Sequence, residues 1–261
     1  MREPIKSLLE HLHLRGMAAY LDEILDNAER TGVSPSDVLV ELLEAESRYQ
    51  QERCLEGRIK RAKLPWPWTI ETFPFKDQPG INKAQVMELA KLTFIERKEN
   101  IVFIGKTGTG KSGIAMSLLR LALLNGYRGR FYNAQDMLDE LYASLADKTT
   151  SKLLLSLSNY DVLVIDELGY LTLTPEQINI FFKLIDMRYQ KKATLITTNL
   201  DFESWYGVFK NKELVDAMLD RLKHNCITLY IDGPSLRAPK LSEEQAENKK
   251  TAQPPAHPNK E

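Results

Sequence analysis

The sequence predicts an α/β fold preceded by a small all-α region, and three observations support this. Between residues 76 and about 232, short Val- and Ile-rich segments alternate with helical patterns. Such alternation is typical of a mostly parallel sheet covered by helices on both faces. The first 64 residues carry only helical patterns. A Pro- and Trp-rich break at residues 64–68 separates the two parts, because each proline disfavours helical geometry in the residue before it.

Composition is that of an ordinary globular protein. The chain has 261 residues, 43% hydrophobic and 27% charged, and 35 Lys+Arg against 36 Asp+Glu give a net charge of -1. This balance excludes a uniformly basic protein that coats nucleic acid. It does not exclude a local basic patch, because basic and acidic patches offset each other in the net charge. Two cysteines cannot build a disulfide framework. With no long apolar run and no signal-peptide core, we expect a cytoplasmic protein without membrane contact.

Residues 1–64 are expected to form helices only. Apolar residues recur at helical spacing before and after Met17, and Gly32 ends that pattern. Ser34 then starts another helix as its N-cap, because Pro35 suits the first helical position and Asp37 stands three residues after the cap. The pattern turns polar beyond Ser47 and ends in a basic stretch, residues 58–63.

The second part contains five expected strands. They span residues 101–105, 129–133, 161–165, 194–197 and 226–230. Helical patterns lie between them, for example at residues 111–124, 175–189 and 214–223. The segment around Phe73 and Phe75 is expected to lie as an apolar strap on this part. Beyond Arg237 the sequence is Pro-rich and polar, which predicts a disordered tail over residues 238–261.

A phosphate-binding loop is the strongest motif. Residues 105–112, GKTGTGKS, fit G-x-x-x-x-G-K-[ST], with an apolar strand before them and an apolar helix after them. In such a loop the backbone N–H groups converge on phosphate oxygens. Lys111 is expected to reach the β- and γ-phosphates, and Ser112 to ligate Mg²⁺. The residues predicted to hold the nucleotide are Gly105, Thr107, Gly108, Thr109, Gly110, Lys111 and Ser112. A chance glycine turn is the weaker alternative.

Polar residues end two of the other strands. Asp166 and Glu167 follow an apolar strand, at the carboxyl edge where parallel sheets place ligands. We expect Asp166 to hold Mg²⁺, directly or through water, and Glu167 to act as the general base for water. Asn199, after the next strand, is suited to hydrogen-bond the γ-phosphate and the water. The alternatives are a solvated acidic turn and a turn asparagine.

Arginines are candidates for a role in a neighbouring subunit. Phosphoryl transfer develops charge that a guanidinium supplied in trans stabilises. Arg188, Arg221 and Arg237 are the candidates, and a surface ion pair is the alternative for each. The tryptophans are expected to be packing anchors rather than base-stacking platforms: Trp66, Trp68 and Trp205.

Together these motifs resemble the AAA+ ATPases of the bacterial initiator group. Within that group the chain resembles the IstB family, the helper ATPases of IS21-type insertion sequences, which are related to the helicase loader DnaC. The resemblance covers about residues 5–237 and rests on VIDELGY at 164–170, TTNL at 197–200, WYGVF at 205–209 and LDRLKH at 219–224. It implies a P-loop AAA+ domain over residues 65–237, with Arg221 as the arginine finger and Asn199 at the sensor-1 position. The chain has no room for a helical lid after Arg221, and Arg237 is the candidate substitute for the sensor-2 arginine of that lid.

The resemblance also suggests where DNA is bound. The segment from Asn133 to Tyr160 is longer than a minimal crossover and matches a helical element that lines a DNA channel in initiator-type members. Our first choice for phosphate contacts is Lys148 and Lys152. The second is the basic stretch with Arg58, Lys60 and Arg61. A solvated helix face is the alternative for both sets.

The function implied by the resemblance is that of an ATP-dependent DNA-binding ATPase. It would use ATP and Mg²⁺, form a homo-oligomer with ATP at subunit interfaces, grip duplex DNA and assist or regulate a transposase. Residues 1–64 would oligomerise further or receive the partner. Two alternatives remain: a replicative helicase loader of the DnaC type, and a small-molecule P-loop kinase. The Asp166–Glu167 pair argues against the kinase, which must exclude water.

Overall fold

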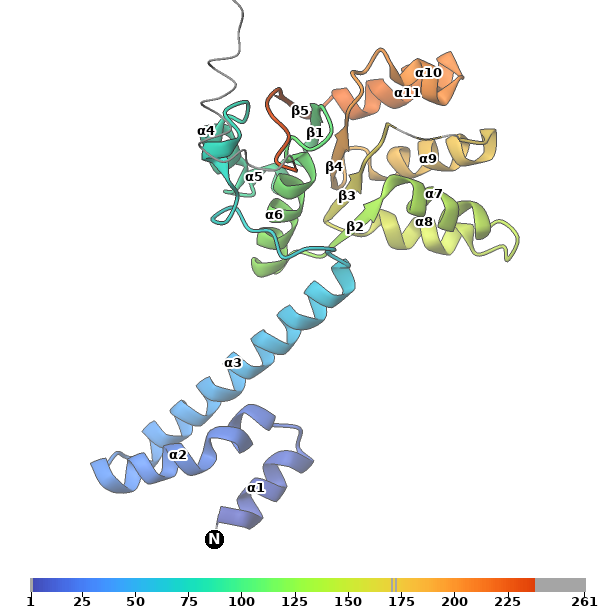
Figure 1. Cartoon of the computed structure of the whole chain (residues 1–261). Coiled ribbons are helices and arrows are strands. Elements are labelled where there is room, and N and C mark those ends of the chain that lie inside the picture. Colours follow the sequence, from blue (N-terminus) through green and yellow to red (C-terminus); the bar gives the residue numbers. More distant parts are fainter. Residues whose placement is uncertain (1, 170, 172, 238–261) are drawn as a thin grey trace, which may run out of the picture.

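The computed structural model describes residues 2–169, 171 and 173–237, and Figure 1 shows two parts of unequal size. Three helices form the first part: α1 (Arg2–His11), α2 (Arg15–Thr31) and α3 (Pro35–Ala62). A parallel sheet with helices around it forms the second. The tail expected at 238–261 lies outside the described residues, as does Tyr170 of the VIDELGY motif. No helix within the described ranges is long and apolar enough to span a membrane.

The first part is held by a small apolar core between its helices. The buried residues of this core are Leu9, Met17, Ala18, Leu21, Ile24, Leu42 and Ala45. At the N-terminus of α3, the Ser34 hydroxyl accepts a hydrogen bond from the Asp37 backbone N–H at 3.2 Å, as a capping residue should. Gly16 lies so close to α3 that a Cβ there would stand 2.6 Å from the Tyr49 Cβ. The glycine therefore allows α2 and α3 to pack closely.

Helix α3 continues into the second part. It is 28 residues long, and Figure 1 shows its C-terminal end reaching the edge of the sheet. There Ala62 is fully buried in an apolar core of the second part, and the Arg130 guanidinium donates a hydrogen bond to the Arg61 carbonyl at 2.6 Å. The Pro- and Trp-rich segment at 64–68 follows directly, after Lys63 with a φ of 53°. The last turns of α3 thus contribute to packing in the second part.

The second part contains the predicted five-stranded parallel sheet. Its strands are β1 (Asn100–Gly105), β2 (Gly129–Asn133), β3 (Val162–Asp166), β4 (Ala193–Thr198) and β5 (Cys226–Ile231). Their order is β2-β3-β4-β1-β5, and every neighbouring pair is parallel. The order brings the carboxyl ends of β3 and β4 next to the end of β1, where the phosphate-binding loop begins. The fold prediction is confirmed, and no strand end differs from its predicted position by more than one residue.

Helices cover both faces of the sheet, as Figure 1 shows. One apolar core combines alternate strand residues with α4 (Lys83–Leu89), α5 (Thr93–Glu96) and α6 (Lys111–Leu124). The other core combines the remaining strand residues with α7 (Ala134–Ala143), α8 (Thr150–Ser158), α9 (Pro175–Arg188), α10 (Trp205–Phe209) and α11 (Lys212–Lys223). Phe73 is buried in the first core, just before the short helix η1 (Phe75–Asp77), so the expected strap is present.

Candidate nucleotide-binding site

The phosphate-binding loop joins the end of β1 to the start of α6. Gly108 and Gly110 have φ angles of 84° and 94°, in the left-handed region that side chains disfavour. A Cβ at Gly110 would also lie 2.7 Å from the Phe73 ring. The loop therefore needs glycine at both positions. The Thr109 hydroxyl donates to the Lys106 carbonyl at 2.9 Å and is buried, so this predicted site residue stabilises the loop.

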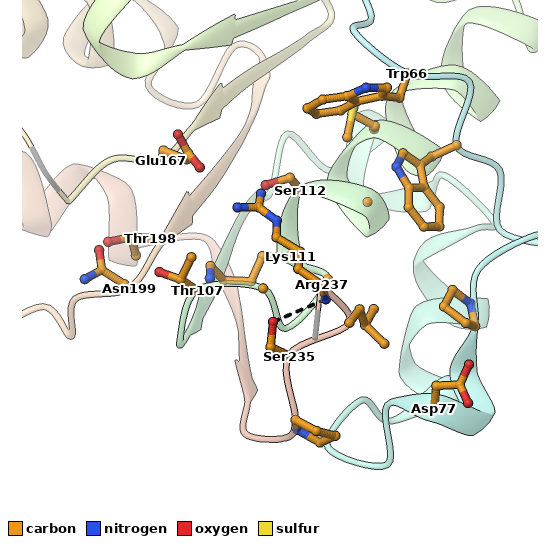
Figure 2. A pocket seen from close by; sticks show the side chains of 18 residues that line it. Trp66, Asp77, Thr107, Lys111, Ser112, Glu167, Thr198, Asn199, Ser235 and Arg237 are labelled. Atoms are coloured by element: carbon orange, nitrogen blue, oxygen red, sulfur yellow. Dashed lines mark hydrogen bonds between the residues drawn. The ribbon is translucent and has the colours of Figure 1, made fainter. Parts of the chain in front are cut away.

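A cavity of about 870 Å³ lies over this loop, a volume typical of a site for a nucleotide-sized ligand. Figure 2 shows its lining side chains. The loop and α6 contribute Thr107, Gly108, Gly110, Lys111, Ser112, Gly113 and Met116. Strand ends contribute Glu167, Thr198 and Asn199, and segments on either side contribute Trp66, Trp68, Pro74, Asp77 and residues 234–237. Most predicted nucleotide residues thus line one cavity.

Lys111 is held against its own loop. Its ammonium donates to the carbonyls of Gly105 and Lys106, both at 2.7 Å. Burial lowers the pKa of Lys111, while the charges of Asp166 and Glu167 act to raise it. An ammonium has three donors, so one remains for a phosphate oxygen in addition to the two carbonyls. Gly105 therefore serves the site through its carbonyl rather than by lining the cavity.

Asp166 and Ser112 meet next to the loop. Asp166 is only 6% exposed, and one carboxylate oxygen accepts from the Thr197 hydroxyl at 2.5 Å. Burial raises the pKa of Asp166, and hydrogen bonds from Thr197 and Ser112 oppose that rise. A hydroxyl and a carboxylate are the oxygen donors that Mg²⁺ prefers. The pair therefore fits the magnesium site predicted for these two residues.

Glu167 stands at the cavity with its side chain exposed. Its backbone adopts a φ of 61°, and its N–H donates to the Thr197 hydroxyl oxygen at 2.9 Å. The Asn133 side chain donates to the carboxylate at 3.2 Å. Thr197 thus contacts both acidic residues, and sequence reasoning gave neither Thr197 nor Asn133 a role. Thr197 lies in the TTNL motif, but the motif does not indicate a contact with the acidic residues; that contact follows from the place of β4 and β2 on either side of β3 in the sheet.

Asn199 lies at the same side of the cavity as Glu167 in Figure 2. It follows the end of β4, and its side chain lines the cavity together with Thr198. A Cβ at Gly169 would stand 2.1 Å from the Asn199 amide oxygen. The glycine in the Asp-Glu-Leu-Gly sequence therefore gives Asn199 its room.

The C-terminal segment closes the cavity from another side. The Leu236 backbone N–H donates to the Gly108 carbonyl at 2.8 Å. The buried Gln78 side chain donates to the carbonyls of Thr109 at 3.1 Å and Pro234 at 2.8 Å, which ties the segment to the loop. Arg237 extends across the cavity toward Ser112 (Figure 2). Arg237 thus lies where the sequence placed it, and Gln78 is a residue that sequence reasoning missed.

The other two arginines lie outside this cavity. The Arg221 guanidinium donates to Asp186 at 2.7 Å and stands 4.9 Å from the centre of the Phe182 ring. Arg188 is only 2% exposed and donates to backbone carbonyls at the end of α8. The candidacy of Arg188 for a role in a neighbouring subunit is therefore wrong, because its guanidinium is buried and fully engaged within its own fold.

The expectation for the tryptophans holds only in part. Trp205 is 1% exposed and packs between Phe202 and Phe209, as an anchor does. Trp68 packs on Phe73 and also lines the cavity. Trp66 lines the cavity and is 56% exposed, so packing does not explain it. The expectation is corrected for Trp66, which presents a large aromatic surface to the candidate site.

The residues predicted to contact DNA lie on α3, on α8 and in the loop before α8. Lys148 is exposed between α7 and α8, and Lys152 is exposed in the first turn of α8. Arg58 is half-buried on α3, and Lys60 and Arg61 are exposed on the same helix. None of these five lines the nucleotide cavity.

Solved structures share the fold of the second part. The DnaC helicase loader aligns with a TM-score of 0.53 and 23% identity, over 66% of this chain and 100% of that one. DnaI aligns with a TM-score of 0.55 and 17% identity, over 64% of this chain and 92% of that one. The replication initiator DnaA, bound to AMPPCP and single-stranded DNA, aligns at 0.54 and 20%, over 64% of this chain and 50% of that one. The fold is that of the P-loop AAA+ proteins.

Sequence relatives extend over nearly the whole chain. An ATP-binding protein of insertion sequence IS5376 from Geobacillus stearothermophilus is 37% identical over 94% of this chain and 98% of its own length. Those of IS232 from Bacillus thuringiensis and IS21 from Pseudomonas aeruginosa are 35% and 34% identical, over 88% and 89% of this chain and 92% and 88% of their own lengths. The model of the IstB-like ATP binding proteins matches residues 7–244. The chain therefore belongs to the family of IstB-like ATP-binding proteins of IS21-type insertion sequences.

Proposed function

We propose that the protein is an ATP-dependent DNA-binding ATPase that assembles on duplex DNA and assists or regulates a transposase. One observation carries the proposal: the phosphate-binding loop, Asp166 and Glu167 meet at one cavity in a member of an insertion-sequence family. An insertion sequence moves by transposition, so an ATP-binding protein encoded with it is suited to assist that reaction.

In the proposed ATP hydrolysis, different residues of the cavity bind the phosphates, hold the metal ion and activate water. Lys111 and the loop N–H groups hold the phosphates, and Arg237 adds a second positive charge from the same subunit. Ser112 and Asp166 are placed to hold Mg²⁺, which when bound neutralises charge on the phosphates. Glu167 accepts a proton from water as the general base, and the Asn199 amide orients that water.

Hydrolysis is favoured over transfer to a small molecule. Glu167 is exposed at the cavity, where a carboxylate can activate water. A kinase must exclude water, which usually requires a closing lid. Within the described residues, β5 leads directly to the segment at 233–237, whose Leu236 N–H donates to the loop at Gly108.

Assembly through a neighbouring subunit explains the position of Arg221. Its side chain is 28% exposed and lies outside the cavity of its own subunit. An ion pair with the half-exposed Asp186 holds it on the surface of α11. To reach the cavity of an adjacent copy, its guanidinium would exchange Asp186 and the Ala217 carbonyl for a phosphate, so ATP would lie at the subunit interface. We assign Arg221 this role and Arg237 the role within the subunit.

A helicase loader is the second candidate, and one observation bears on the choice. The likeness to DnaC covers 66% of this chain at 23% identity, which shows a shared fold. The relatives at 34–37% identity extend through the helical first part and come from insertion sequences. This favours transposition. The two candidates also differ in DNA form, because transposition requires duplex target DNA and a loader acts on separated strands.

Lys111→Ala tests the proposal. Binding to fluorescent duplex and single-stranded DNA would be measured with ATP, with ADP and without nucleotide, using Lys91→Ala as an exposed-lysine control. We expect ATP-dependent duplex binding in the wild type and the control, and its loss in Lys111→Ala. Undiminished binding without nucleotide would refute the ATP switch. A preference for single strands would favour the helicase loader.

A further inference from the structure

A second pocket lies at the opposite edge of the sheet from the nucleotide cavity. It has a volume of about 310 Å³. Its lining residues come from the end of α3, α6, the start of β2 and α8: Arg58, Arg61, Leu123, Arg128, Gly129, Ser156, Asn159 and Tyr160. Gly129 is the first residue of β2, so the pocket opens at the amino ends of the strands. The ATP site, in contrast, lies at their carboxyl ends.

The pocket is strongly positive. Three of its eight lining residues are arginines and none is acidic. The Nε of Arg58 is buried and has no hydrogen-bond partner among the described residues. A buried guanidinium N–H without a partner is unfavourable, and an anion in the pocket would relieve that cost. Arginine is also the side chain whose planar fork best matches a phosphate group.

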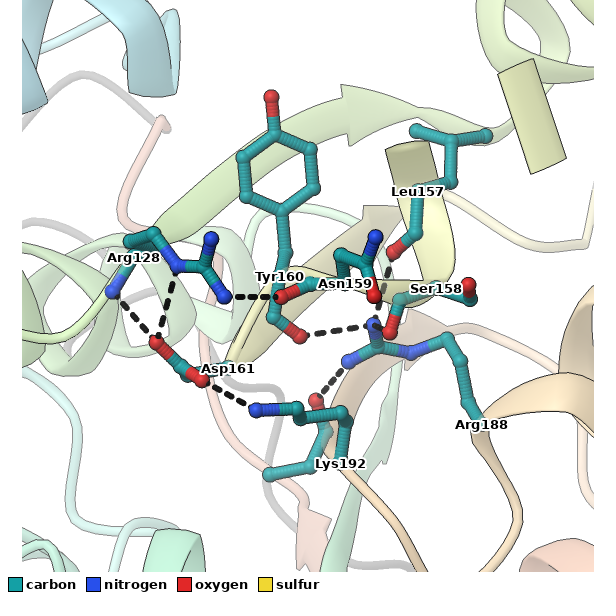
Figure 3. A network of polar contacts seen from close by, with 9 residues as sticks. Arg128, Leu157, Ser158, Asn159, Tyr160, Asp161, Arg188 and Lys192 are labelled. Carbon is teal, nitrogen blue, oxygen red and sulfur yellow. Dashed lines mark hydrogen bonds and ion pairs between the residues drawn. The ribbon is translucent and has the colours of Figure 1, made fainter. Parts of the chain in front are cut away.

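Arg128 lines this pocket, and Figure 3 shows the polar contacts that hold its side chain. Its guanidinium donates to the Asn159 carbonyl at 3.1 Å and stands 3.7 Å from the Asp161 carboxylate. That carboxylate also accepts from Lys192 at 2.5 Å and from the Arg128 backbone N–H at 2.8 Å. Lys192 and Arg128 thus share the single negative charge of Asp161, and the charges of Arg58 and Arg61 have no acidic partner among the lining residues of the pocket.

The turn behind the wall is rigid for a separate reason. The buried Arg188 donates to the carbonyls of Leu157 and Tyr160, each at 2.9 Å (Figure 3). These bonds fix the end of α8 and the two residues that follow it, Asn159 and Tyr160. A site held in this way needs little rearrangement to bind its ligand.

Helix α8 extends the positive surface away from the pocket. Lys152, Ser156 and Asn159 are separated by four and three residues, so they share one face of the helix. Four residues advance a helix by about 6 Å. Lys152 therefore stands one turn beyond the pocket, and Lys148 lies in the loop before this helix. A nucleic-acid backbone presents its phosphates at similarly short, regular intervals.

We infer that the arginine pocket binds a phosphate group of the DNA backbone, and that Lys152 contacts a neighbouring phosphate on the same strand. The inference rests on the proposed function, because it assumes that the protein grips DNA. It joins the two basic regions of the sequence into one surface. It also places DNA contact at the sheet edge opposite the ATP site.

The double substitution Arg58→Gln, Arg61→Gln tests the pocket, with Arg48→Gln as a charge control on an exposed part of α3. Duplex binding would be measured with ATP over a range of salt concentrations. We expect affinity to fall about 10- to 100-fold and the salt slope to drop by about 1, the value for one lost phosphate contact, in the double variant only. Thermal unfolding checks that each variant is folded. Should the double variant unfold, Arg58→Lys, Arg61→Lys keeps the charge and should retain the slope.

A second measurement separates this inference from the proposed function. Pyrophosphate would be titrated into the Lys111→Ala protein, with and without the two pocket substitutions, and its stabilisation followed by thermal unfolding. We expect the pocket substitutions to reduce that stabilisation. If the variant with both pocket substitutions binds duplex DNA as tightly as the wild type, the pocket does not contact DNA, although the proposed function stands. If the substitutions reduce the stabilisation by pyrophosphate but not the affinity for DNA, the pocket binds a free phosphate compound instead. If the substitutions change neither the affinity for DNA nor the stabilisation by pyrophosphate, the pocket is not an anion site.

Discussion

Thr197 links the two acidic residues of the ATP site. Its hydroxyl donates to the Asp166 carboxylate, and the same oxygen accepts from the Glu167 backbone N–H. One hydroxyl therefore fixes both the residue that would hold Mg²⁺ and the residue that would activate water. Because it is a short, buried side chain, its geometry is set by β4 itself.

The substitution Thr197→Val should lower the rate of ATP hydrolysis more than it lowers ATP affinity. Valine keeps the shape but cannot donate to Asp166 or accept from Glu167. Loss of a hydrogen bond to a charged group corresponds to about 1.5–3 kcal/mol, or about 10- to 100-fold in kcat. Phosphate release and nucleotide binding give the two numbers. Thr228→Val on β5 is the matched control, and an unchanged kcat in Thr197→Val would contradict this role.

The sequence predicted the main residues of the ATP site better than it predicted the hydrogen bonds that hold them. The loop, Asp166 and Glu167 are recognisable because each follows a strand in a short, specific pattern. Thr197 and Asn133 carry no such signal, since their roles depend on β4 and β2 lying on either side of β3. Trp66 was misread because a tryptophan beside prolines gives no indication of which surface it faces.

At the scale of elements, polar contacts fix the join between α8, β3 and β4. Arg188 at the end of α9 donates to the carbonyls that end α8 and to the Thr194 hydroxyl at 2.9 Å. Burial lowers the pKa of Arg188 to about 9, so it remains charged at neutral pH. Sequence could not assign this role, because α8 and β4 meet Arg188 only through tertiary packing.

Asp161 makes this join sensitive to acid. Burial acts to raise the pKa of Asp161, but the hydrogen bond from Lys192 and the contacts of Arg128 outweigh it, so the pKa is lowered. A carboxyl group whose folded pKa is depressed contributes stability above its unfolded pKa, near 4. That contribution is lost as the pH falls through the folded pKa.

The free energy of unfolding should therefore decrease as the pH falls below about 4, and Asp161→Asn should remove part of that decrease. The variant should also cost about 1–3 kcal/mol at neutral pH. Denaturant unfolding over a pH series measures both effects. Asp147→Asn, at an exposed position in the loop between α7 and α8, is the control. Equal pH dependence in the wild type and Asp161→Asn would show that the ion pair does not stabilise the fold.

At the scale of the whole molecule, two anion sites occupy opposite edges of one sheet. The ATP cavity joins β1, β3 and β4 to segments at 66–77 and 234–237. The arginine pocket joins α3 to the start of β2 and the end of α8. The sequence predicted the helical N-terminal region and the five-stranded parallel sheet with its flanking helices. It could not predict the pocket, because Arg58 and Arg128 meet only when α3 packs on the sheet edge.

Helix α3 links the two functional regions of the proposed assembly. It connects the N-terminal helices to the edge that carries the arginine pocket (Figure 1). Exposed apolar residues on the N-terminal helices include Leu8, Leu12, Leu39 and Leu43. In the proposed assembly, partner binding by these helices and DNA binding at the pocket would take place at the two ends of one rigid helix.

The central claim is that ATP binding drives assembly on duplex DNA and hydrolysis through Glu167 reverses it. The most direct test is to measure phosphate release and the lifetime of the duplex complex in Glu167→Gln, with Glu176→Gln as an exposed-glutamate control. We predict that release falls about 10²- to 10⁴-fold while the ATP-bound complex forms normally and lasts longer than that of the wild type. Unchanged phosphate release, or a complex that dissociates as fast as that of the wild type, would contradict the account.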